Sequence, residues 1–226
     1  MEYNKLMPIG NEKFSLGTLS CKGIGYSITK EEIETALSGK VYRNHYSVDE
    51  LDALKFELNL KETGFGEEEL NATFTSFNGL EPWRIGESFA ESWLEDHRKC
   101  SFPWKNQHDI RSLKASLPGT DMVGLTSLGY DKFFAFGEVK TSSDINNPPG
   151  VVYGGKGLTY QILNIIDSKK QRRQLIQNLG MRALGQKWFS DYKNAFVSHM
   201  QDRYYYWGIL IRDTSPNIKD MEHSVK

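Results

Sequence analysis

Two runs of β-forming residues, joined by a short turn, constrain the fold of this 226-residue chain more than any other feature. The first run covers residues 121–125 and the second covers residues 132–140. The residues at 128–131 (Leu-Gly-Tyr-Asp) suit a tight turn, so the two runs are predicted to pair as an antiparallel hairpin. This pairing decides which of their side chains can meet.

Three charged side chains converge if the hairpin forms. Glu138 and Lys140 are two residues apart on one strand, so they emerge on the same face while Val139 points to the opposite one. The start of the first strand lies opposite the end of the second, which places Asp121 beside Glu138. An isolated Glu-x-Lys is usually a solvated charge pair. Here the Glu138-Val-Lys140 segment ends an apolar strand, and an acidic helix precedes that strand in the chain. We therefore interpret these charged residues as part of a catalytic site.

Metal-dependent phosphodiester hydrolysis needs this set of groups. Asp121 and Glu138 would hold a divalent ion that activates water and neutralises charge on the phosphate. Lys140 would orient the attacking water or stabilise the transition state by its charge. A third carboxylate, from Glu87 or Glu91 on a helix predicted over about 85–98, would complete the shell. Such an oxygen-rich ligand set favours Mg²⁺, with Mn²⁺ as an alternative.

The first third of the chain carries signals for short helices. Thr29 with Glu32, and Ser47 with Glu50, form capping boxes in which a hydroxyl and a carboxyl satisfy the free amides of a helix start. This region contains no motif that indicates chemistry. It is predicted to be a helical extension.

The part of the chain after the hairpin is predicted to contain two helices and a strand. Tyr160, Leu163 and Ile166 are expected to supply the apolar face of the first helix, and Ser168 to cap the start of the second. The continuous apolar run at 204–211 is typical of a buried strand. The order of helix, hairpin, helices and strand predicts an α/β fold in which helices cover a sheet.

The residues of the hairpin also resemble a known family. Gly119-Thr-Asp121, followed by Phe136-Gly-Glu138-Val-Lys140, is similar to the core signature of PD-(D/E)xK nucleases, although Pro118 lies three residues before Asp121 instead of directly beside it. The resemblance implies a restriction-endonuclease-like core, a mixed sheet flanked by helices, over residues 81–226. Residues 1–80 would then be the N-terminal extension.

A narrower resemblance, spanning roughly residues 84–161, is to HamA, the nuclease subunit of the Hachiman anti-phage system. It rests on Arg84-Ile-Gly-Glu87, Gly119-Thr-Asp121 and Gly137-Glu138-Val-Lys140. It implies that Glu87 is the helix carboxylate, with Glu91, one turn away, able to share or replace it. Gln161 falls where related nucleases place a polar residue near the site, and an ordinary solvated glutamine is an equally good interpretation.

The same resemblance implies a partner. A helicase subunit, HamB-like, would restrain the nuclease until it meets aberrant DNA, and residues 1–80 would be the docking region. Two alternatives stay open: a restriction or repair endonuclease that acts alone, and a non-catalytic interaction subunit that keeps the nuclease fold. Divalent-metal binding would separate the last from the others.

Composition limits how the chain can contact DNA. The 28 Lys and Arg against 29 Asp and Glu give a net charge of −1, which argues against a generic basic coat protein. DNA contact must therefore come from a local patch, and the densest basic run supplies Lys169, Lys170, Arg172 and Arg173. A solvated helix surface is the commoner meaning of such a run.

Two absences in the sequence complete the expectations. The two cysteines, Cys21 and Cys100, form no CxxC or Cys/His cluster, which argues against a zinc site or a disulfide framework. No targeting segment and no membrane span is recognised, so a cytoplasmic location is expected.

Overall fold

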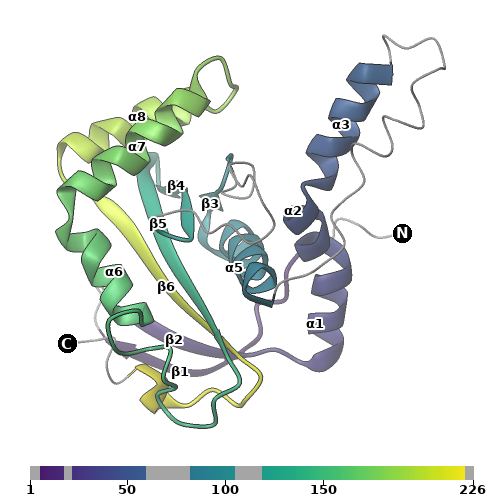
Figure 1. The fold of residues 1–226 in the computed structure, drawn as a ribbon, viewed down its shortest axis with the longest axis vertical. Helices are drawn as coiled ribbons and strands as arrows, with labels where there is room; N and C mark the ends of the chain where they lie inside the picture. Colours follow the sequence, from purple (N-terminus) through teal and green to yellow (C-terminus); the bar gives the residue numbers. More distant parts are fainter. Residues whose placement is uncertain (1–5, 18–21, 60–81, 105–118, 222–226) are drawn as a thin grey trace.

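The structure is a computed structural model that describes residues 6–17, 22–59, 82–104 and 119–221 (Figure 1). Its main sheet contains four strands, in the order β3 (Cys100–Ser101), β4 (Met122–Leu128), β5 (Asp131–Ser142) and β6 (Tyr204–Arg212). Strands β3, β4 and β5 pair antiparallel, whereas β6 runs parallel to β5. The predicted α/β class with a mixed sheet is therefore confirmed.

The predicted hairpin is formed by β4 and β5. Leu128 pairs with Asp131 at the turn, and the register runs from there to Met122 opposite Gly137. Strand β5 continues beyond that pair and stays bonded to β6 as far as Ser142. The last residues of β5 therefore have a strand on one side only.

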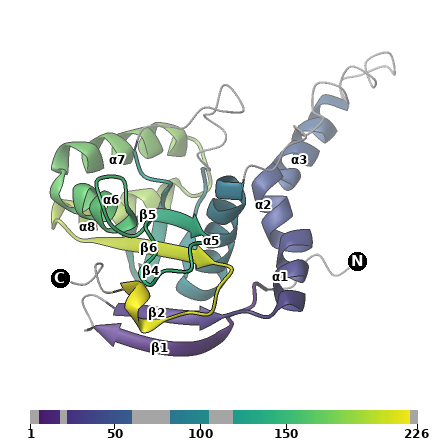
Figure 2. The same ribbon diagram turned by 60° about the horizontal axis from the view of Figure 1, so that its bottom comes forward.

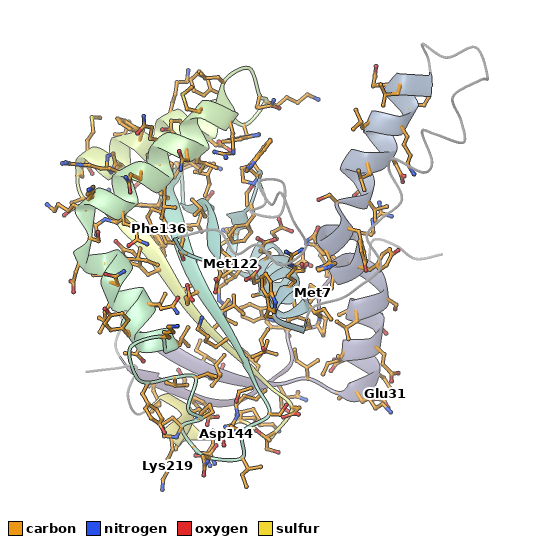
Figure 3. The ribbon with its side chains drawn as sticks, viewed as in Figure 1. Met7, Glu31, Met122, Phe136, Asp144 and Lys219 are labelled. Carbon is orange, nitrogen blue, oxygen red and sulfur yellow. The ribbon has the colours of Figure 1, made fainter. Side chains whose placement is uncertain are left out.

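Helices cover both faces of the sheet (Figures 1 and 2). Those involved are α5 (Pro82–Arg98), α6 (Leu158–Asp167), α7 (Lys169–Ala183) and α8 (Phe189–Met200). Phe136 packs in the core beneath α6, α7 and α8, whereas Met122 packs with residues of α5, and Figure 3 labels both. Alternate residues of β5 follow the same division, since Phe134 joins the first cluster and Val139 the second.

The N-terminal region contains a small sheet that the sequence interpretation missed. Its elements are β1 (Asn11–Gly17), β2 (Lys22–Ser27), α1 (Lys30–Ala36), the π-helical turn η1 (Leu37–Val41), α2 (Tyr42–Tyr46) and α3 (Val48–Asn59). The extension is therefore not purely helical. Strands β1 and β2 pair antiparallel, and Gly25 leaves room for the Phe14 ring, which approaches within 2.2 Å of where a Cβ would stand.

The capping signals of the extension can be compared with the helices that form. The Thr29 and Glu32 capping box is present and starts α1. Helix α3 follows Ser47 as predicted, but Ser47 itself ends α2 in a left-handed conformation. The side chain of Glu50 lies outside the described residues.

The C-terminal half corrects two expectations about burial. Ser168 caps α7 as predicted. Helix α6, however, turns Leu158 and Ile165 inward, while Tyr160, Leu163 and Ile166 are exposed. Both sets of apolar residues recur with the period of a helix, and packing against the sheet determines which set is buried. Strand β6 is only half-buried because it is an outer strand. The chain then continues to a short 3₁₀ helix, η3 (Ile218–Met221). None of the helices in the described ranges has the length and apolar character to span a membrane.

Candidate active site

Asp121 lies where β4 begins, beside the open edge of β5. Its Oδ2 accepts a hydrogen bond of 2.8 Å from the backbone N–H of Val139. The preceding residue, Thr120, is buried, and its hydroxyl donates to the carbonyl of Gly137. These two contacts hold the carboxylate against β5, which is an inner strand of the sheet. Thr120 was missed from sequence because a threonine before an aspartate has no distinctive signature.

Glu138 and Lys140 lie on one face of β5, as predicted. The Nζ of Lys140 and the Oε1 of Glu138 are 2.6 Å apart, and Glu138 is only 1% exposed. Its other oxygen, Oε2, is buried and has no hydrogen-bond partner among the described residues. A buried acceptor without a donor is unfavourable unless a proton or a cation satisfies it.

Asp121 lies close enough to Glu138 for the two carboxyls to form a hydrogen bond. Burial and the Asp121 charge raise the pKa of Glu138 to about 7, although the hydrogen bond and charge of Lys140 act in the opposite direction. Such a bond between two acids requires that one of them carries a proton. The structure therefore brings Asp121, Glu138 and Lys140 together, while their catalytic roles stay predictions.

Glu87 on α5 lies within electrostatic reach of this cluster. Burial and the charges of Asp121, Glu91 and Glu138 together raise its pKa to about 8, against the opposing charge of Arg84. Glu91 is buried one turn farther along the same helix. The carboxyls of α5 and of the hairpin therefore share one region of negative potential.

A complete metal-binding shell is not assembled. Among the residues that the structure describes, no three His, Cys, Asp or Glu side chains form a group ready to hold an ion. The donor set nevertheless fits a hard divalent ion, because Asp121 and Glu138 supply neighbouring oxygens and Glu138 Oε2 has no other partner. Glu87 would have to move closer to join them.

Gln161 bonds to the turn that precedes α6. It lies in the first turn of α6, where its side-chain amide donates a 2.9 Å hydrogen bond to the carbonyl of Lys156. In this structure it braces the glycine-rich turn before α6 and makes no bond to the carboxyl cluster.

The basic run at the start of α7 is corrected at one position. Arg172 is 3% exposed, donates to the carbonyls of Ile165 and Ile166, and stacks over the Tyr204 ring at 4.9 Å. A side chain held in this way cannot contact a phosphate. The other three members, Lys169, Lys170 and Arg173, are exposed, although Lys169 lies 3.5 Å from an oxygen of Asp202.

No protein-family model, curated protein or solved structure matches this chain. The arrangement of its own side chains is therefore what bears on its function.

Proposed function

We propose that this chain is a metal-dependent nuclease that hydrolyses DNA phosphodiester bonds. The observation that carries the proposal is the state of Glu138, buried beside Asp121 with one oxygen bonded to Lys140 and the other without a donor. Buried acids with raised pKa values and a specific charged neighbour cluster at functional sites. If Glu138 and Lys140 formed only a structural ion pair, the second carboxyl group of Asp121 would not be needed beside it.

Each residue has a distinct role in the proposed mechanism. Asp121, Glu138 and, after a small approach, Glu87 would hold Mg²⁺ or Mn²⁺. A bound ion would supply Lewis-acid stabilisation of the charge that develops on the phosphate. The 2.8 Å bond from the Val139 N–H fixes the orientation of the Asp121 carboxylate before any ligand arrives.

Lys140 would act on water or on the phosphate. Its ammonium now lies 2.6 Å from Glu138 and retains 22% exposure, so it can face an incoming substrate without leaving the site. With an ion held by Asp121 and Glu138, the Lys140 ammonium would be free to hold the attacking water or to neutralise a non-bridging phosphate oxygen. Lys140 would therefore be needed for turnover but not for metal binding.

Delivery of DNA by another subunit fits the charge distribution. The net charge is −1, and burial of Arg172 removes one cation from the only dense basic run. Phosphate neutralisation supplies most non-specific DNA affinity, so free DNA should bind weakly. We therefore propose a helicase partner within a cytoplasmic anti-phage defence complex, which would raise the local concentration of broken or single-stranded DNA. The 1–80 region is the proposed docking region, and its α3 projects from the body in both views (Figures 1 and 2).

Glu138→Ala tests the nuclease proposal. The purified variant should lose Mg²⁺-dependent cleavage of DNA while keeping the circular dichroism spectrum of the wild type. Glu31→Ala, a change at an exposed position of α1, is the matched control and should cleave normally. Unchanged cleavage by folded Glu138→Ala protein would rule this carboxylate out.

One observation favours a second candidate, a non-catalytic subunit that keeps the nuclease fold. The three predicted carboxylates do not form a ready metal group in the described part of the chain. Calorimetric titration with Mn²⁺ separates the candidates, because an inert fold has no reason to bind the ion at Glu138.

A nuclease that acts alone would cleave equally fast with and without the helicase and ATP.

A further inference from the structure

We infer that Gly86, packed against Thr141, lets the Glu87 turn of α5 lie close enough to β5 for the Glu87 side chain to reach the hairpin carboxylates. Gly86 precedes Glu87 in the helix, and Thr141 follows Lys140 in the strand. The pair would act as positioning residues, because neither touches the proposed ion or substrate. The inference rests on the proposed site, in which Glu87 must reach the ligands on the hairpin.

The Gly86 backbone lies closer to the Thr141 side chain than a Cβ at position 86 would allow. A Cβ placed on Gly86 would lie 2.4 Å from Thr141 Cγ2 and 3.8 Å from the terminal carbon of Ile211. Contacts between 3.4 and 4 Å are ordinary van der Waals distances. Glycine is the least favoured residue of a helix interior after proline, so its presence in this buried turn calls for a packing reason.

Thr141 cannot easily give way to a larger residue at position 86. It is β-branched, so its χ1 angle is restricted, and it lies on a strand that is bonded to β6 through Ser142. An added methyl group at Gly86 would therefore push the helix backbone away from the strand by about 1 Å, the gap between the 2.4 Å contact and an ordinary one.

Neighbouring contacts prevent α5 from sliding to relieve such a clash. Farther along the helix, Ala90 and Leu94 pack with Met122 and Val139 in a buried cluster. Two residues after Gly86, Ser88 Oγ lies 3.2 Å from a ring nitrogen of His45. Held at both places, the helix can relieve the clash only by tilting its first turns outward, which would carry Glu87 away from Asp121 and Glu138.

The test combines Gly86→Ala with a compensating change, Thr141→Ala. The single Gly86→Ala variant should weaken Mn²⁺ binding, measured by calorimetry, by about tenfold or more, and misplacement by about 1 Å should lower the cleavage rate by up to about 100-fold. The double variant removes the methyl that Gly86→Ala meets. It should return the Mn²⁺ affinity and the Mg²⁺ dependence of cleavage to within about threefold of wild type, as volume-conserving swaps generally do.

Gly180→Ala is the matched control. A Cβ at Gly180, also in a helix, would lie 2.4 Å from the Tyr192 hydroxyl, so the clash is equally close but lies between α7 and α8. This variant should keep the wild-type Mn²⁺ affinity, which would show that a helix clash alone does not weaken the metal site.

Three outcomes would overturn the inference: wild-type Mn²⁺ affinity in folded Gly86→Ala, a folded double variant as defective as the single one, or an equal loss in Gly180→Ala. If Gly86→Ala does not fold, the double variant must restore both folding and Mn²⁺ affinity, and failure to do so also overturns it. Wild-type protein that binds Mn²⁺ but never cuts DNA would overturn the proposed function instead, and the affinities would still decide the role of Gly86.

Discussion

Glu87 should make the stability of the metal-free protein fall as pH rises from 6 to 9. Its pKa is raised to about 8 by burial and by the neighbouring Asp121 and Glu91 charges, against an ordinary value of 4.5. The folded protein therefore binds a proton there more tightly than the unfolded chain does. Stability from this group is fully present below the unfolded pKa and is lost as pH rises through 8.

The expected size of the effect follows from the interval between pH 6 and pH 8. Over these two pH units the folded state keeps a proton that the unfolded state has lost, at about 1.4 kcal/mol per unit. The loss of stability between pH 6 and pH 8 is therefore about 3 kcal/mol. Little further loss is expected above pH 9, where the folded state has also released the proton. For a chain of this length 1 kcal/mol shifts the melting temperature by about 2–4 °C, so Tm should fall by roughly 6–12 °C.

Added Mg²⁺ should act with the opposite pH dependence. An ion at Glu87 requires the carboxylate, so binding releases the proton and becomes tighter as pH rises. Saturating Mg²⁺ should therefore raise the melting temperature more at pH 9 than at pH 6. Scanning fluorimetry over this pH range, with EDTA or Mg²⁺, measures both effects.

Glu87→Gln isolates the contribution of this carboxyl. Other groups titrate nearby: burial raises the pKa of Glu138 to about 7 and that of Cys100 to about 11, and lowers the pKa of His45. All three are retained in the variant, so the difference between the two proteins reports the loss of the Glu87 carboxyl and of its interaction with Glu138. Parallel pH profiles of wild type and Glu87→Gln in EDTA would refute the reasoning, since they would mean that Glu87 carries no shifted proton.

Three further predictions concern single side chains and the partner. Lys140→Ala should bind Mn²⁺ as tightly as wild type in calorimetry but should not cleave DNA, and a loss of Mn²⁺ binding would contradict its assignment to water or phosphate. Arg172→Met should lower the free energy of unfolding by about 3 kcal/mol in urea denaturation, because it removes a buried hydrogen-bonded charge, whereas exposed Arg173→Met should change it by less than about 0.5 kcal/mol. Adding the proposed helicase and ATP should accelerate cleavage, and equal rates in its absence would remove the partner hypothesis.

The sequence by itself determined the local arrangement of the hairpin and its charges. Side chains two apart on a strand must share a face, so Glu138 and Lys140 were predicted to meet, and a 2.6 Å contact joins them. The turn at 128–131 fixed the register that brings Asp121 to the end of β5. The capping box at Thr29 was equally readable. In each case the interaction follows from backbone geometry over a few residues or from direct strand pairing.

Burial and the approach of distant elements were decided only by the tertiary structure. Arg172 looked like a solvated cation of a basic run, yet it is buried because the end of α6 and Tyr204 close over it. The exposed and buried stripes of α6 fit the same helical period, and packing against the sheet determines which of them is buried. The distance from Glu87 to the hairpin depends on Gly86 meeting Thr141, which lies 55 positions away in the chain. Sequence periodicity describes one element at a time, whereas these outcomes depend on which surfaces of separate elements come into contact.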